Sequence, residues 1–134
     1  MIKYIYDLPD IDSFFELYES TGWNDKDKKS KEQLFNAITN SWYFISAYSN
    51  DQLVGCGRVI SDKYLHAYIN EMIVLPNFQR KGIGKEILNR LLQKILESGI
   101  KDIQLFCAKG REEFYIKNGF ENRPNDAPGM QYKL

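Results

Sequence analysis

The chain has little of what marks secreted, metal-binding or nucleic-acid-binding proteins. Its only two cysteines, Cys56 and Cys107, stand far apart with no close histidine or cysteine partner, which fits neither a zinc site nor a disulfide framework. We expect both to be small core residues, and we expect no bound metal. Eighteen basic residues balance eighteen acidic ones, so no overall field draws the protein toward nucleic acid or an anionic membrane. Any anion site must therefore be local.

Long apolar runs are also missing. The start, Met1-Ile2-Lys3, is polar by its third residue, and no later apolar run approaches the roughly 18 residues that span a bilayer. We therefore expect a cytoplasmic protein. The 134 residues, 43% of them hydrophobic, suit a single domain over residues 1–134 with one core and without repeats or linkers.

Hydrophobic spacing predicts a mixture of strands and helices. The expected extended segments are Lys3–Tyr6, Trp42–Tyr48, Leu53–Ile60, His66–Leu75, Ile103–Cys107 and Phe120–Leu134. The expected helices are Asp10–Tyr18, Ser30–Ile38, Ile83–Ser98 and Arg111–Lys117. Asn50-Asp51 favours a tight reversal, which makes the second and third extended segments a hairpin.

Helix boundaries are marked by capping residues. Asp10 can cap the first helix, and Ser30 with Gln33 forms a capping-box pattern at the start of the second. From Ile83 onward the apolar residues follow a period of 3.6, and Gly99 is well placed as the C-cap. This third helix is the most clearly indicated element of the chain.

The segment Ile69–Cys107 has the order strand, helix, strand. Such a crossover places its two strands side by side and parallel, with the helix across one face of the sheet. The hairpin and the two chain ends are expected to extend that sheet with antiparallel strands. The predicted fold class is therefore α+β, or mixed α/β, in one layered domain.

A basic, glycine-containing turn links the strand ending at Leu75 to the helix at Ile83. It is Gln79-Arg80-Lys81-Gly82-Ile83-Gly84. Two glycines one residue apart allow close approach of a bulky ligand, and the first helical turn presents unpaired N–H groups that suit phosphate oxygens. No Ser, Thr, Asp or Asn stands at the expected N-cap. The turn alone favours a plain glycine-rich connection whose lysines face water, and it matches neither the P-loop nor the Rossmann pattern.

Two motifs give the chain a family resemblance. Val74-x-Pro76-x-x-Gln79-x-x-Gly82-x-Gly84 resembles the Q/R-x-x-G-x-G/A pyrophosphate-binding motif of the GNAT N-acetyltransferases, and Phe114–Phe120 resembles a second segment of that family. The resemblance implies a mostly antiparallel mixed sheet with one parallel pair and helices on both faces. It also implies transfer of an acetyl group from acetyl-CoA to an amine by direct attack in a ternary complex.

The resemblance assigns site residues. The backbone N–H groups expected to hold the pyrophosphate lie beside Gln79 and belong to Arg80, Lys81, Gly82, Ile83, Gly84 and Lys85. The strand edge expected to pair with the pantetheine arm is Met72, Ile73 and Val74. Tyr115 matches the tyrosine that protonates the departing thiolate in many members, although a core aromatic is the alternative.

An amine must lose a proton before it attacks, so a base or a water relay is expected. Glu71 is the best candidate because a carboxylate on a central strand is unusual unless it faces a cleft, but a salt bridge or an edge position would explain it equally well. His66, the only histidine, is expected to be a surface or half-buried residue rather than the base.

The chain also departs from the family. Ala108 stands where an asparagine often helps to fix CoA, and Arg111 replaces a common alanine. Arg111 and Lys109 could reach the 3′-phosphate of the adenosine, or simply face solvent. The Ala108 substitution favours the alternative of a non-catalytic acyl-CoA-binding or sensing module.

The acceptor side is less well defined. The resemblance places the first interhelical loop there, so Trp23 is the expected substrate-binding residue, with packing as a lid as the alternative. The acceptor is expected to be an amine of a small molecule or peptide. The resemblance also allows a homodimer.

Overall fold

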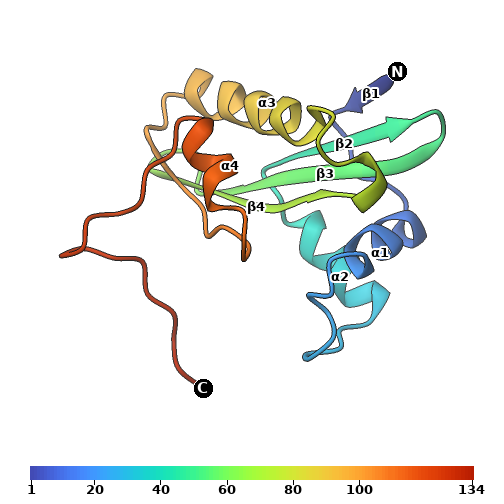
Figure 1. Ribbon diagram of the computed structural model, residues 1–134, viewed down its shortest axis with the longest axis horizontal. Coiled ribbons are helices and arrows are strands. Elements are labelled where there is room, and N and C mark those ends of the chain that lie inside the picture. Colours follow the sequence, from blue (N-terminus) through green and yellow to red (C-terminus); the bar gives the residue numbers. More distant parts are fainter.

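Five strands form one mixed sheet in the computed structural model, which describes residues 1–134 (Figure 1). In sheet order they are β1 (Ile2–Ile5), β2 (Tyr43–Ser49), β3 (Gln52–Ser61), β4 (His66–Val74) and β5 (Asp102–Gln104). Only β4 and β5 run parallel; the other neighbouring pairs are antiparallel. The predicted fold class, with one parallel pair in a mostly antiparallel sheet, is confirmed.

Four α-helices cover the two faces of this sheet. They are α1 (Ile11–Glu19), α2 (Lys31–Thr39), α3 (Ile83–Glu97) and α4 (Glu112–Lys117), and a short 3-10 turn, η1, spans Pro76–Phe78. The Asp10 side chain accepts from the Ser13 N–H at 2.9 Å, and Ser30 and Gln33 form a reciprocal capping box. Both predicted caps are confirmed. No helix is long and apolar enough to cross a bilayer.

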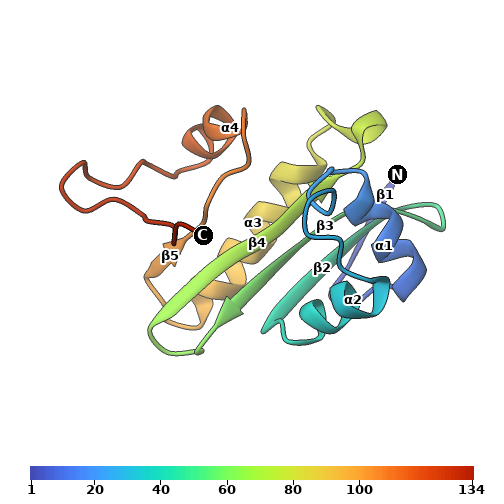
Figure 2. The same ribbon diagram turned by 90° about the horizontal axis from the view of Figure 1, so that it is seen from below.

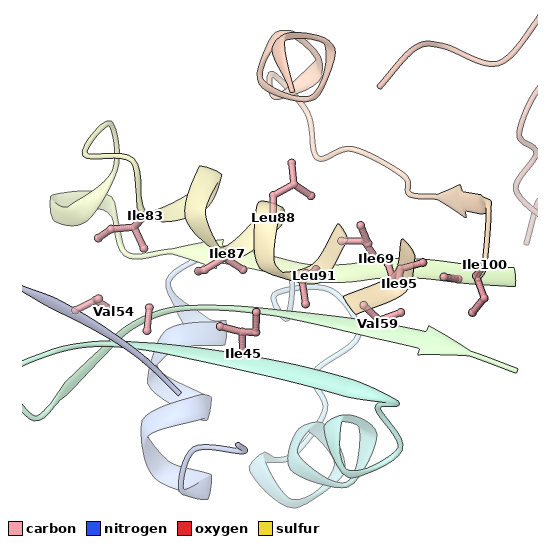
Figure 3. Packing of buried hydrophobic residues seen from close by; sticks show 12 residues of the cluster. Ile45, Val54, Val59, Ile69, Ile83, Ile87, Leu88, Leu91, Ile95 and Ile100 are labelled. Atoms are coloured by element: carbon pink, nitrogen blue, oxygen red, sulfur yellow. The ribbon is translucent and has the colours of Figure 1, made fainter. Parts of the chain in front are cut away.

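Helix α3 packs on one face of the sheet and builds the larger core. Its buried residues Ile83, Ile87, Leu91 and Ile95 point toward the strands, whereas the buried Leu88 side chain points away from the sheet (Figure 3). A side chain at position 57 would clash with this helix, because a Cβ there would lie 2.7 Å from Ile87 Cγ2. The glycine therefore lets α3 approach β3 closely.

Helices α1 and α2 pack on the opposite face (Figure 2). Their buried apolar residues meet those of β2, β3 and β4 in a second cluster: Phe14, Leu17, Leu34, Ile38, Phe44, Leu53, Cys56 and Ile73. The prediction that Cys56 is a core residue is confirmed, since it is fully buried.

A β-bulge interrupts the pairing of β3 with β4. Cys56 pairs with Ile73 and Arg58 with Asn70, so the single residue between them on β3 faces two on β4. One of those two, Glu71, has a φ of 49°, in the left-handed region that favours glycine. The bulge lies just before the end of β4 that the sequence predicts to bind the ligand.

Three predictions for the C-terminal third were wrong in whole or in part. The strand predicted at Ile103–Cys107 is only β5, and Cys107 is exposed rather than part of the core. After Gln104 the chain diverges from β4, so the apolar residues that follow have no neighbouring strand. Residues 120–134 form no strand. Phe120 still packs against the core, and residues 121–134 leave the layers as an exposed tail that turns at Pro124–Ala127 (Figure 1).

Candidate active site

A cavity of about 650 Å³ opens at the end of β4 where the sheet splits. β5 pairs with β4 only at residues 66–68, whereas β3 pairs with β4 as far as Val74. One edge of Met72, Ile73 and Val74 is therefore free of a strand partner, and all three residues line the cavity. This is the edge that the sequence predicts to receive an extended ligand arm.

The N-terminus of α3 forms a second wall. Gly82 is the N-cap with a φ of 85°, and no side chain caps the helix. The first helical bond runs from the Glu86 N–H to the Gly82 carbonyl at 3.0 Å, which leaves the N–H groups of Ile83, Gly84 and Lys85 without helical partners. The predicted lack of a capping side chain is confirmed, and the helix dipole makes this end attractive to an anion.

The loop before α3 is held by Gln79. Its amide nitrogen donates to the Val74 carbonyl at 2.9 Å, and its amide oxygen accepts from Arg111 Nη2 at 3.2 Å. Gln79 thus ties the end of β4 to the segment preceding α4, across the cavity. Arg80 completes the turn with a φ of 63°.

The charged side chains that line the cavity are all basic. They are Arg80, Lys85, Lys109 and Arg111. Because no carboxylate lines the cavity, these groups create the local positive field that the neutral total charge of the chain does not supply.

Not every predicted ligand residue points its side chain into the cavity. The Lys81 ammonium lies 5.3 Å from the centroid of the Phe78 ring, and Ile83 is buried in the core beneath α3. Gln79, Gly82 and Gly84 do line the cavity. The predicted roles of Lys81 and Ile83 concern only their backbone N–H groups, and these roles stay predictions.

Tyr115 lines the cavity from α4. Its ring packs edge-on against Phe114 and Phe120, with centroid distances of 5.0 and 5.7 Å. Burial, and after it the charge of Cys107, raises the pKa of Tyr115 to about 12, while Arg111 opposes the shift. The hydroxyl makes no hydrogen bond within the chain, and no polar side-chain atom is both buried and unpaired, so the hydroxyl remains accessible.

The loop between α1 and α2 closes the remaining side. Trp23 lines the cavity with 43% of its surface exposed, and its ring lies edge-on to Tyr18 at 5.8 Å. Asn24 is buried and shapes the loop instead: its side chain donates to Glu19 and bonds the backbone of Lys29 twice. Trp23 therefore lines the cavity whereas Asn24 does not, and Thr21 of the same loop lines it as well.

Glu71 and His66 lie outside the cavity lining. The Glu71 carboxylate accepts from Arg58 Nε at 2.6 Å, so the salt bridge anticipated as an alternative is present. His66 is exposed at the start of β4 and bonds Asp102, as expected of a surface residue. The role of Glu71 as a base stays a prediction.

Three further lining residues were not predicted. They are Ser20, Pro76 and Phe114. Pro76 and Phe114 belong to the two motifs, so their place in the pattern could have indicated them. Ser20 follows the end of α1, and its hydroxyl donates to the Leu17 carbonyl at 2.6 Å, which gives no sequence signal beyond a helix end.

Known proteins resemble this chain in sequence and in fold. The model of the Acetyltransferase (GNAT) family matches residues 8–120. An uncharacterised N-acetyltransferase, ycf52, of Pyropia yezoensis is 33% identical over 119 residues, which cover 86% of this chain and 67% of that protein. Two other relatives are covered over only 30% and 55% of their length. The chain therefore spans only part of these longer proteins.

Solved structures share the architecture. A probable acetyltransferase, SA2161, from methicillin-resistant Staphylococcus aureus is 26% identical with a TM-score of 0.87, and each chain is covered completely. The N-acetyltransferase PaiA of Thermoplasma acidophilum, solved in complex with coenzyme A, has the same fold at 23% identity. Its TM-score is 0.74 over 92% of this chain and 91% of that one.

Proposed function

Because this chain belongs to the GNAT acetyltransferase family, we propose that it transfers the acetyl group of acetyl-CoA to a primary amine of a small molecule or peptide. The observation that carries the proposal is the meeting of an unpaired strand edge with an uncapped helix N-terminus in one basic cavity. Cytoplasmic location, a single domain over residues 1–134 and a homodimer stay predictions from the sequence.

The residues of the cavity suit acetyl-CoA. The free N–H groups of Ile83, Gly84 and Lys85 would receive the pyrophosphate, and Arg80 and Lys85 would add positive charge. The edge of Met72–Val74 would pair with the amide-containing arm. When bound, the donor supplies a thioester whose sulfur is the leaving group.

The chain supplies two electrostatic functions for the reaction. A backbone N–H on the β4 edge would stabilise the charge that develops on the thioester oxygen. Tyr115 would protonate the departing thiolate, and with a pKa raised to about 12 its hydroxyl carries the proton at neutral pH, as an ordinary tyrosine does.

The attacking amine must also be deprotonated. Because Glu71 does not line the cavity, its carboxylate would accept this proton through water rather than by direct contact. The same carboxylate is held by Arg58 through an ion pair of 2.6 Å.

The acetyl group would pass directly between donor and amine, without an acyl-enzyme. Cys56 is fully buried, and burial raises the pKa of its thiol well above the ordinary value, so it is a poor nucleophile. Cys107 is exposed but does not line the cavity. We expect Cys107→Ala to retain activity, and trapping of an acetylated cysteine during turnover would contradict direct transfer.

One observation favours a second candidate, a module that binds acyl-CoA without catalysis. Ala108 lines the cavity where many family members have an asparagine, and its methyl group cannot hydrogen-bond a ligand. Such a module would bind acetyl-CoA but would release no thiol with any acceptor.

Two measurements separate these candidates. Calorimetric titration with acetyl-CoA tests the donor site, and a thiol-release assay with a panel of aliphatic, aromatic and peptide amines tests transfer. We expect binding and amine-dependent thiol release. Binding without release favours the sensing module, and absence of binding would overturn both.

A further inference from the structure

The bulge on β4 puts an unfavourable backbone conformation beside the proposed donor site. The single residue Gly57 faces both Glu71 and Met72, and the φ of 49° at Glu71 is one that residues other than glycine seldom adopt. A conformation of this kind persists only where its surroundings hold it in place.

Arg58 holds the left-handed backbone conformation of Glu71 in place. Its Nε donates to Glu71 Oε1 at 2.6 Å, and its Nη1 donates to the Ala37 carbonyl near the end of α2 at 3.1 Å. The two charged side chains are only 10% and 20% exposed, so solvent does not compete strongly for this pair. The buried Cys56 thiol adds a contact of 3.2 Å to the Glu71 carbonyl.

The bulge determines what faces the cavity. It sends the Glu71 carboxylate to Arg58 on the α2 side of the sheet. Met72 reaches the α3 side, where its sulfur would lie 2.8 Å from a Cβ placed on Gly57. The cavity-lining edge of Ile73 and Val74 follows directly. A β4 without the bulge would shift this edge by one residue and reverse the direction of its side chains.

We infer that Arg58 is a positioning residue for the donor site. By holding the carboxylate of Glu71, it maintains the left-handed bulge and thereby aims the Met72–Val74 edge into the cavity. The inference rests on the proposed function, since the ligand of that edge is acetyl-CoA.

The test is a rescue experiment read by the Kd for acetyl-CoA, measured by calorimetry. Arg58→Met removes the guanidinium but keeps much of its volume, and we expect the Kd to rise by about tenfold or more. Adding Glu71→Gly should return the Kd to within about threefold of wild type, because glycine adopts a positive φ without help. Adding Glu71→Val instead should give no rescue, because a β-branched residue is strongly disfavoured at this φ.

The outcomes are distinct. If Arg58 only stabilised the fold in general, both double variants would bind acetyl-CoA equally, and that result would overturn the inference. An unchanged Kd for a folded Arg58→Met would overturn it as well. If Arg58→Met alone does not fold, the comparison of the two double variants still decides. Failure of the wild type to bind acetyl-CoA would instead overturn the proposed function. The kcat of the rescued variant is a separate readout, because loss of the Glu71 carboxylate can lower kcat without affecting the Kd.

Discussion

The side-chain amide of Gln79 donates a hydrogen bond to the backbone carbonyl of Val74 at 2.9 Å. This bond joins the last residue of β4 to the loop that leads into α3, and a second bond from Arg111 reaches the same amide group. The glutamine of the family motif therefore closes the loop in this chain, and we expect it to affect acetyl-CoA binding through the shape of the cavity.

Replacing Gln79 should loosen that loop. In Gln79→Leu the partly buried Val74 carbonyl loses its donor, which should lower the free energy of unfolding by about 1 kcal/mol and weaken acetyl-CoA binding. Urea denaturation and calorimetry measure the two effects. Gln93→Leu is the control, because Gln93 makes one exposed bond to Glu97 on α3. Equal effects at both positions would contradict the closure role.

Gly57 should tolerate no side chain. A Cβ there would lie 2.7 Å from Ile87 and 3.0 Å from Leu91, so Gly57→Ala should destabilise the protein by roughly 1–3 kcal/mol through overpacking beneath α3. Gly84→Ala is the matched control, since its Cβ would meet nothing closer than 3.6 Å. Thermal unfolding of the two variants checks the contrast. A Gly57→Ala protein as stable as Gly84→Ala would show that α3 can shift away from the sheet.

These features mark what the sequence could and could not predict. Caps at Asp10 and Ser30 and the apolar stripe of α3 depend on neighbours within a few residues, so their patterns were sufficient. The chain from Leu105 to Cys107 is apolar enough for a strand, but whether a strand forms depends on β4 remaining alongside. That is a property of the whole sheet, and β4 and β5 diverge there.

The residues of the site were likewise predictable only where they depend on near neighbours in the sequence. The motif located the helix N-terminus and Tyr115, because both belong to continuous segments. The pairing of Glu71 with Arg58 depends on the β3–β4 register and its bulge, which no local pattern specifies. A carboxylate on a central strand therefore predicted either a base or an ion pair, and only the register placed Arg58 beside it.

The positive charge of Lys85, and not that of Lys81, should strengthen acetyl-CoA binding. Lys85 lines the cavity, whereas the Lys81 ammonium lies over the Phe78 ring. We expect Lys85→Gln to raise the Kd for acetyl-CoA several-fold at low salt and Lys81→Gln to change it by less than about twofold. The difference should shrink in about 1 M salt, where the Debye length falls to about 3 Å. Equal effects of the two variants would show that only net charge matters.

Loss of the Tyr115 hydroxyl should slow the reaction without weakening donor binding. Tyr115→Phe keeps the ring contacts with Phe114 and Phe120, so the Kd for acetyl-CoA should hold while kcat falls on the order of 100-fold at neutral pH. Tyr43→Phe is the control, because Tyr43 stacks on Tyr6 away from the cavity. A kcat equal to wild type would remove the general-acid role.

The raised pKa of Tyr115 also predicts a change in stability with pH. The unfolded chain releases this proton near pH 10, whereas the folded protein keeps it to about pH 12. The stabilisation that the hydroxyl provides is therefore complete below pH 10 and is lost as the pH rises through 12. Urea midpoints measured from pH 8 to 11 should fall less for Tyr115→Phe than for wild type. Parallel curves would contradict the shift.

Trp23 should affect the acceptor and not the donor. It lines the cavity from the α1–α2 loop, while the strand edge and helix N-terminus lie on other walls. With the amine that gives the fastest thiol release, Trp23→Ala should raise the KM for that amine about tenfold, roughly 1.4 kcal/mol of binding, with little change in the Kd for acetyl-CoA. Trp23→Phe keeps an aromatic face beside Tyr18 and should recover most of the loss. An increase confined to the Kd for acetyl-CoA would instead show that Trp23 contacts the donor and not the acceptor amine.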